Sequence, residues 1–250
     1  MKNPVELTGR ERAAYVQEMF TRIAGRYDLM NRLMTAGQDV RWRWEVIRRA
    51  ALPAGGRLLD LGAGTGDMAL EALRQQPACR SVAADFTLAM MQVGMRRQRE
   101  KSPGAPFPVW SAADALNLPF ADQSFDAVVS GFLMRNVSDV MQALGEQKRV
   151  MRPGGRIVVL DTTRPSRNLL TPFINIHLKM IIPGLGRLLT GQADAYNYLP
   201  ESTQAFLTAE QLAQRMQAAG FEQVGFRRLM FGTIAIHWGE SPQPPFIRGD

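Results

Sequence analysis

LLDLGAGTGD, residues 58–67, is the stretch that decides the fold of this chain. It is typical of an apolar strand that runs through a glycine-rich turn into a helix, the arrangement that holds a nucleotide cofactor in α/β domains. Alternate glycines let the backbone approach a ligand closely, with the amides of the helix N-terminus facing that ligand. The stretch therefore predicts a cofactor site that includes Gly62 and Gly64.

The spacing of these glycines distinguishes between cofactors. A dinucleotide fingerprint is Gly-x-Gly-x-x-Gly, whereas this turn is Gly62-x-Gly64-x-Gly66. Asp60 lies two residues ahead of the turn, where its carboxylate would repel a pyrophosphate. The same carboxylate suits S-adenosylmethionine, whose sulfur and amino group are both cationic. We therefore expect S-adenosylmethionine as the cofactor.

Two more acids follow the next two predicted strands. The strand at residues 80–85 ends in Asp85, whose two oxygens can accept both ribose hydroxyls of an adenosine. The strand at residues 107–112 ends near Asp114 and Ala115, beside the place of the adenine ring, and Asp114 can accept from the exocyclic amine. Phe86, next to Asp85, is assigned to the same site. Each acid alone is more often a helix cap or a loop residue, but three at successive strand ends favour a joint cofactor site.

Composition indicates one domain. The 250 residues are 46% hydrophobic, which suffices for one large core, and we place a single domain at residues 1–240 and a disordered tail at 241–250. No apolar run of about eighteen residues and no signal peptide occurs, so a cytoplasmic location is expected. One cysteine and two histidines leave no Cys/His cluster, so no metal is expected.

The charge favours an anionic partner. The net charge of +7 and the pI near 10.2 fit nucleic acid or an acidic membrane surface, or simply an enzyme rich in arginine. No block of consecutive basic residues with interleaved aromatics is present, as a nucleic-acid groove would show. We therefore favour a peripheral contact with the inner face of the membrane and expect no nucleic acid.

The remaining pattern alternates helices and strands. Helices are predicted at residues 10–23, 41–50, from 68, at 88–99, from Val140 to Pro153 and at 208–219, the last with a capping box of Thr208 and Gln211. Further strands are predicted at 125–132 and 156–160, and residues 221–228 and 232–238 should form an antiparallel hairpin at the sheet edge. The fold class is therefore α/β, a Rossmann-like class I methyltransferase with a seven-stranded, mostly parallel sheet and an antiparallel C-terminal hairpin strand.

Two segments stand outside this alternation. Residues 1–52 form a helical cap ahead of the sheet, and residues 161–207 form an insertion on the substrate side. Within the insertion, residues 169–189 are strongly apolar and are broken by prolines and glycines. Such a segment either covers a substrate pocket, lies in a membrane interface or forms an ordinary pair of core helices.

Several short motifs together resemble one family, the UbiE/MenG-type quinone C-methyltransferases. The resemblance covers nearly the whole chain, and its most specific pieces are Tyr27-Asp28-Leu29-Met30-Asn31, Arg135-Asn136-Val137 and Tyr198-Leu199-Pro200-Glu201-Ser202. It implies transfer of a methyl group from S-adenosylmethionine to a ring carbon of a polyprenylated quinol, most simply demethylmenaquinol, in menaquinone or ubiquinone biosynthesis. By motif position, the resemblance places cofactor contacts at Thr65, Asp85, Asp114, Ala115 and Gly131.

The chemistry of such a transfer suggests catalytic candidates. A ring carbon becomes nucleophilic when a neighbouring hydroxyl loses its proton, and Arg135, just past the fourth strand, is the candidate that stabilises the phenolate. His237 is the candidate base, although it is expected on the edge hairpin. Asn136 and Tyr198 are candidates for orienting the ring, with core packing as the alternative role of Tyr198.

Departures from the family pattern leave the substrate open. Two motifs near the substrate side differ from the family's usual sequence. The family's Phe-Gly-Leu-Arg is replaced by Phe132-Leu133-Met134-Arg135, and its Glu-Phe-Ser-Lys-Pro is replaced by Asp161-Thr162-Thr163-Arg164-Pro165. The alternatives are a methyltransferase for another lipid or small molecule, an RNA methyltransferase, for which no Asn-Pro-Pro-Tyr-type motif occurs, and a nicotinamide oxidoreductase, which the glycine spacing disfavours. A homodimer is also left open.

Overall fold

The computed structural model describes residues 7–101, 104–164 and 193–243. Its centre is one seven-stranded sheet in the order β3-β2-β1-β4-β5-β7-β6. The strands are β1 (Arg57–Leu61), β2 (Arg80–Asp85), β3 (Val109–Ala112), β4 (Phe125–Gly131), β5 (Met151–Thr162), β6 (Glu222–Leu229) and β7 (Ile234–Glu240). The first five pair in parallel, and β7 pairs antiparallel with both β5 and β6. The predicted sheet and its hairpin are therefore confirmed.

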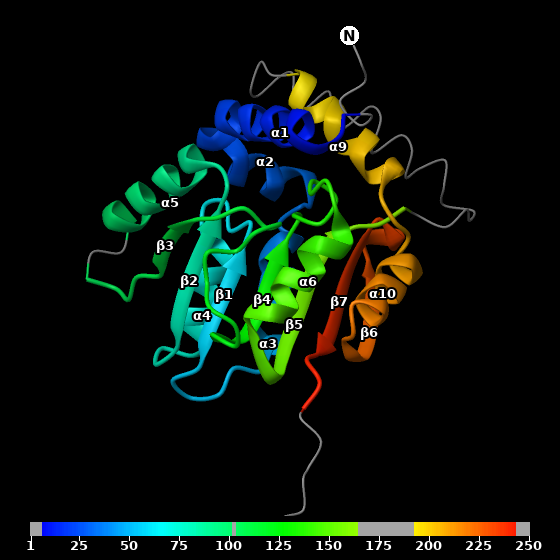
Figure 1. The fold of residues 1–250 in the computed structure, drawn as a ribbon. Coiled ribbons are helices and arrows are strands. Elements are labelled where there is room, and N and C mark those ends of the chain that lie inside the picture. Colours follow the sequence, from blue (N-terminus) through cyan, green and yellow to red (C-terminus); the bar gives the residue numbers. More distant parts are fainter. Residues whose placement is uncertain (1–6, 102–103, 165–192, 244–250) are drawn as a thin grey trace, which may run out of the picture.

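Helices cover both faces of the sheet. On one face lie α6 (Val140–Val150) and α10 (Ala209–Ala218), and behind the sheet lie α3 (Gln38–Ala50) and α4 (Asp67–Gln75) (Figure 1). The buried strand residues alternate between these layers, since Leu59 and Leu61 pack with α6 and α10 while Leu58 packs with α3 and α4. Both faces are buried, as expected for a mainly parallel sheet.

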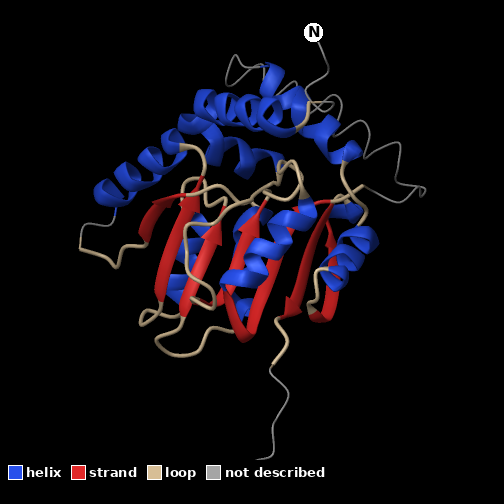
Figure 2. Ribbon diagram, viewed as in Figure 1, coloured by secondary structure: helices blue, strands red, loops and turns tan. Residues whose placement is uncertain are grey.

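A third layer lies across the carboxyl ends of the parallel strands (Figure 2). It contains α1 (Gly9–Ile23), the short 3-10 helix η2 (Ala24–Arg26), α2 (Tyr27–Met34) and α9 (Ala193–Ala205), while α5 (Leu88–Lys101) follows β2. Met19, Ile23, Met30 and Tyr198 form a small core of their own between these helices. The strand ends are therefore covered by α1 and α2, which precede the sheet in the sequence, and by α9, which follows β5.

Two local predictions need correction. The helix expected to run to Pro153 ends at Val150, and β5 already begins at Met151, because Met151 pairs with Phe125 before a register shift. The helix α2 was not predicted. It has only eight residues, and it begins directly after η2. The capping box of Thr208 and Gln211 is confirmed at the start of α10.

The remaining segment boundaries stay predictions. The apolar run at residues 169–189 and residues 244–250 of the predicted tail lie outside the described residues. Ser241, which the prediction placed in the disordered tail, is buried: its amide donates to the Gly155 carbonyl at 2.8 Å, and its carbonyl accepts from the Gly154 amide at 2.9 Å. Within the described part of the chain, no helix is long and apolar enough to cross a membrane.

Candidate functional site

The glycine-rich turn after β1 is tied to the end of β2. Gly62, Gly64 and Gly66 have φ of 67°, 58° and 82°, the left-handed region that favours glycine. The amides of Gly62 and Ala63 both donate to the carbonyl of Ala84, at 2.8 and 3.0 Å. The Gly64 amide donates to Asp85 Oδ2 at 2.7 Å, and the Gly66 amide donates to the Ala63 carbonyl at 2.8 Å. These four amides therefore bond to other groups of the chain, whereas the sequence predicted that the turn's amides face the ligand. Because they are occupied, the turn is a poor site for a phosphate.

Asp85 ends β2 and is buried, with 9% of its surface exposed. Besides Gly64, the Thr87 amide donates to its Oδ1 at 2.7 Å. Burial raises the pKa of Asp85, and the backbone amides of Thr87 and Gly64 oppose that rise. Each carboxylate oxygen keeps a further lone pair, so Asp85 can still accept hydrogen bonds from a ligand.

A cavity of about 90 Å³ opens at the strand ends, and we call it the strand-end cavity. Its wall is formed by Val16, Phe20, Tyr27, Leu61, Gly62, Gly64, Asp85, Phe86, Thr87, Met90, Ala113, Ala115, Gly131, Phe132, Leu133 and Asn136. Six of the predicted cofactor residues are brought together here: Gly62, Gly64, Asp85, Phe86, Ala115 and Gly131.

Three predicted cofactor residues lie outside this wall. Asp60 is 1% exposed and accepts from the Ala69 amide of α4 at 3.0 Å, and burial raises its pKa to about 7. The Thr65 hydroxyl donates to Asp28 Oδ1 at 2.7 Å. Asp114 is exposed and accepts from the Leu116 amide at 2.9 Å. The structure thus uses these side chains to hold the chain around the cavity.

A second cavity of about 40 Å³ adjoins the first, and we call it the methionine cavity. It is lined by Met19, Phe20, Ile23, Tyr27, Met30, Asn31, Met34, Arg135, Asn136 and Tyr198. Phe20, Tyr27 and Asn136 line both cavities. The predicted catalytic residues Arg135, Asn136 and Tyr198 are therefore brought together beside the predicted cofactor residues.

The polar groups of the methionine cavity are held by specific bonds. The Tyr198 hydroxyl donates to Asn136 Oδ1 at 3.2 Å, and Asn136 Nδ2 donates to the Phe132 carbonyl at 2.9 Å. Arg135 is 6% exposed, and its Nη1 donates to Asp161 Oδ1 at 2.6 Å. The ion pair with Asp161 fixes the guanidinium of Arg135 in place.

His237 lies away from both cavities. It is 1% exposed on β7, its Nε2 hydrogen-bonds the Ala209 carbonyl at 2.9 Å, and its ring lies 5.4 Å from that of Phe226. Burial lowers the pKa of His237, although the Ala209 carbonyl opposes this. The structure does not bring the candidate base to the other candidates.

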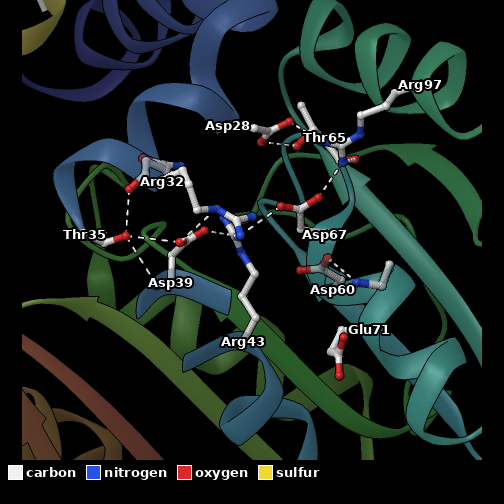
Figure 3. Close-up of polar contacts among 12 residues, drawn as sticks. Asp28, Arg32, Thr35, Asp39, Arg43, Asp60, Thr65, Asp67, Glu71 and Arg97 are labelled. Atoms are coloured by element: carbon white, nitrogen blue, oxygen red, sulfur yellow. Dashed lines mark hydrogen bonds and ion pairs between the residues drawn. The ribbon is translucent and has the colours of Figure 1, made fainter. Parts of the chain in front are cut away.

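An ionic network ties α2, α3 and α5 to the glycine-rich turn (Figure 3). Asp28 of α2 accepts from Thr65 and also pairs with Arg97 of α5. Arg97 pairs with Asp67 at 2.5 Å, and Asp67 pairs with Arg43 of α3 at 3.0 Å. Burial and the nearby Asp67 carboxylate raise the pKa of Asp28. The pKa of Asp67 is instead below its usual range, because Arg43 and Arg97 outweigh the effect of burial. The sequence contained no signal for these pairings, because their partners are up to 69 residues apart.

The comparisons with known proteins decide the family. Residues 8–241 match the ubiE/COQ5 methyltransferase family. The chain belongs to this methyltransferase family. It is 45% identical to the ubiquinone/menaquinone biosynthesis C-methyltransferase UbiE of Desulfotalea psychrophila, over 90% of this chain and 89% of that protein. It is 43% identical to the demethylmenaquinone methyltransferase of Thermus thermophilus, over 90% of this chain and all of that protein.

Solved structures share the fold of this methyltransferase. The cyclase SpnF matches with a TM-score of 0.67 at 19% identity, over 92% of this chain and 96% of that one. Phosphoethanolamine N-methyltransferase 2 of Haemonchus contortus, solved with S-adenosylmethionine, matches with a TM-score of 0.61 at 14% identity, over 81% of this chain and 53% of that one. At these identities the likeness shows the class I methyltransferase fold alone.

The cofactor of this methyltransferase is S-adenosylmethionine. The residues of the strand-end cavity fit such a molecule. The turn has no free amide among Gly62, Ala63, Gly64 and Gly66 for a phosphate, and the Asp85 carboxylate has acceptor capacity left for hydroxyl groups.

Proposed function

We propose that this protein transfers the methyl group of S-adenosylmethionine to a ring carbon of a polyprenylated quinol, with demethylmenaquinol as the first substrate to test. The observation that carries the proposal is that the methionine cavity directly adjoins the strand-end cavity through Phe20, Tyr27 and Asn136. Apart from its polar groups, the methionine cavity is lined by five apolar side chains: Met19, Phe20, Ile23, Met30 and Met34. The names of the relatives, which include a demethylmenaquinone methyltransferase, support the same substrate class.

In this proposal the strand-end cavity holds the cofactor and the methionine cavity holds the ring. When bound, S-adenosylmethionine supplies an electrophilic methyl group. Asp85 binds the ribose hydroxyls, and Phe86, Ala115 and Gly131 line the site. Phe20 and the methionines exclude water from the point where the cavities meet.

The protein's part in the chemistry is to favour the ionised ring. When bound, the cofactor would give up its methyl group and leave as the neutral thioether, while the substrate hydroxyl and then the methylated ring carbon would each release a proton to solvent and the ring oxygen would regain one. Arg135 keeps its charge, so it stabilises the phenolate by electrostatics and does not take the proton. The pair of Asn136 and Tyr198 fixes the orientation of the ring.

A lipid amine is the second candidate substrate, because the fold also occurs in a phosphoethanolamine N-methyltransferase. Carboxylates stabilise a cationic amine, yet none of the described residues that line the methionine cavity is acidic. Its polar groups are Tyr27, Asn31, Arg135, Asn136 and Tyr198. This set favours a substrate that carries negative charge.

Peripheral contact with an acidic membrane surface is part of the proposal, since a polyprenyl tail keeps the substrate in a bilayer. Its support is the net charge of +7 and the exposed apolar side chains of Leu29 and Leu33 on α2 and of Trp44 on α3. A homodimer stays an open prediction.

The test is a side-by-side assay of the purified protein with S-adenosylmethionine. The substrates are demethylmenaquinol, a 2-polyprenyl-methoxybenzoquinol and a phospholipid amine, and mass spectrometry detects a gain of one methyl group. We expect methylation of a quinol ring and none of the amine. Methylation of the amine alone would overturn the proposal.

A further inference from the structure

The methionine cavity contains two buried nitrogen donors without a hydrogen-bond partner. They are Nδ2 of Asn31 and Nε of Arg135. The other polar groups nearby are engaged, since Asn136 and Tyr198 bond each other and Arg135 Nη1 bonds Asp161. A buried donor without a partner is costly, so native proteins seldom keep one without a use.

Asn31 lies on the inner side of α2. It is 8% exposed, and with Tyr27, Met30 and Met34 it forms the side of this helix that lines the cavity. Burial raises the pKa of Tyr27, and a hydrogen-bonding contact with the Asn31 side chain opposes that rise. The Tyr27 hydroxyl is therefore the neighbour of this side chain, but Nδ2 lies outside hydrogen-bond geometry with every described group.

The Asn31 side chain is not needed to hold its own backbone. The Asn31 carbonyl accepts from the Thr35 amide at 3.0 Å and from the Thr35 hydroxyl at 2.8 Å. The helix α2 therefore closes through main-chain and Thr35 contacts, which leaves the amide nitrogen of the side chain free for a ligand.

We propose that Asn31 is a substrate-binding residue, whose Nδ2 donates to an oxygen of the substrate ring, with Arg135 Nε as the second donor. This inference rests on the proposed function and narrows it, because two donors select a ligand group that accepts hydrogen bonds. An ionised ring oxygen is such a group, and it binds donors more strongly than a neutral hydroxyl does. A protonated amine has no acceptor and would leave both donors unpaired.

Charged and titratable groups from several elements face this position. They are Tyr27 of α2, Tyr198 of α9, and Arg135, which pairs with Asp161 of β5 and whose carbonyl accepts from Arg12 of α1. Arg135 is the cation that lines the cavity, so a donor at Asn31 adds to its preference for an anionic oxygen. Removing that donor should make ionisation of the substrate harder.

The test uses the full-length protein with Asn31→Leu. We expect kcat/KM for demethylmenaquinol to fall by about tenfold or more, and the pH of its half-maximal value to rise, because the phenolate loses a donor. Affinity for S-adenosylmethionine should stay unchanged, since Asn31 does not line the strand-end cavity. The melting temperature of the ligand-free variant should not fall, because an unpaired buried donor has been removed.

Two further variants keep the test decisive. Asn31→Asp preserves the shape but faces the ring oxygen with an acceptor, so it should lose more activity than Asn31→Leu. Thr233→Val is the matched control, because its buried hydroxyl is satisfied by the Met230 carbonyl at 2.8 Å and lies on neither cavity wall. That variant should lower the melting temperature and leave the pH profile unchanged.

The outcomes separate the two claims. A wild-type protein that methylates no quinol overturns the proposed function. A wild-type protein that methylates the quinol, with Asn31→Leu showing the same pH profile and a lower melting temperature, overturns the role of Asn31 alone.

Discussion

Asp85 holds the turn, and in the proposed complex the same carboxylate also binds the ligand. Two backbone amides, those of Gly64 and Thr87, already bond its oxygens, each at 2.7 Å. Its remaining acceptor capacity faces the strand-end cavity. The position of Asp85 at the end of β2 was predictable from the sequence. Its hydrogen bond with the Gly64 amide was not, because that contact depends on how the turn folds back onto β2.

Asp85→Asn should therefore weaken cofactor binding. An amide has one acceptor oxygen in place of two, so either the turn or the ribose loses a charge-assisted bond, and the affinity for S-adenosylmethionine should fall by about tenfold or more. Calorimetry measures this affinity. Asp122→Asn is the matched control, because Asp122 is exposed and pairs only with Arg149 among the described residues. Equal affinity in wild type and Asp85→Asn would contradict the assigned role.

Asp60 should make the stability of the protein depend on pH. Burial raises its pKa from the ordinary value of 3.8 to about 7, so the native protein binds a proton that the unfolded chain lacks across this window. Stability of the ligand-free protein should consequently decrease as the pH rises from about 4 to about 7. Asp60→Asn should make this slope shallower without removing it, because burial also raises the pKa values of Asp28 and Asp85. Urea unfolding at several pH values can measure the difference.

The same group should release a proton when the cofactor binds. A cationic ligand near Asp60 favours the carboxylate, so binding at pH 7 should release up to about half a proton. Calorimetry in two buffers of different ionisation enthalpy detects this release, and Asp60→Asn supplies the baseline. The absence of any difference between the two proteins would show that Asp60 does not sense the ligand.

At the scale of elements, α2 joins the two cavities to the turn. Tyr27 lines both cavities, and the next residue, Asp28, holds Thr65 and Arg97. The contact with Thr65 at 2.7 Å sets the position of α2 relative to the glycine-rich turn. In the proposed complex, the distance between the ring and the methyl group thus depends on a helix of eight residues.

Asp28→Asn should impair the transfer more than cofactor binding. Asparagine can still accept from Thr65 but loses the ion pair with Arg97, so α2 is held less firmly over the cavities. We expect kcat/KM for the quinol to fall about tenfold, since small errors in position cost large factors in rate. Steady-state kinetics and calorimetry with S-adenosylmethionine measure the two effects. A loss confined to cofactor affinity would contradict the positioning role.

The elements differ in how well the sequence predicts them. The strands and long helices follow from hydrophobic periodicity, and Arg135 follows from the rule that parallel strands end at one edge. Gly131 was assigned by the resemblance to the family. The α2 helix is too short for periodicity to identify, and β5 begins before its Pro-Gly-Gly because Met151 pairs with Phe125. Side-chain direction was the other obstacle. Asp60 turns to the Ala69 amide at the start of α4 and Thr65 turns to Asp28 of α2, and neither direction can be read from the sequence pattern.

At the scale of the whole molecule, the site lies between the sheet and a roof of helices. The parallel strands end beneath α1, α2 and α9 (Figure 1). Leu29 and Leu33 of α2 are 54% and 43% exposed, on the helix whose other side lines the methionine cavity. A helix with one apolar side toward the substrate and another toward solvent suits an enzyme whose substrate comes from a membrane.

The whole molecule should therefore bind anionic vesicles in a salt-dependent way. The net charge of +7 attracts an acidic surface, and this attraction weakens as the Debye length falls from about 10 Å at 0.1 M salt to about 3 Å at 1 M. Cosedimentation with anionic and with neutral vesicles measures the effect, and the double variant Leu29→Ser with Leu33→Ser tests the apolar part. We expect binding to anionic vesicles at low salt, less binding at high salt and a further loss in the double variant. Absence of binding to anionic vesicles at low salt would rule out the membrane contact, while full binding by the double variant would exclude α2 as its site.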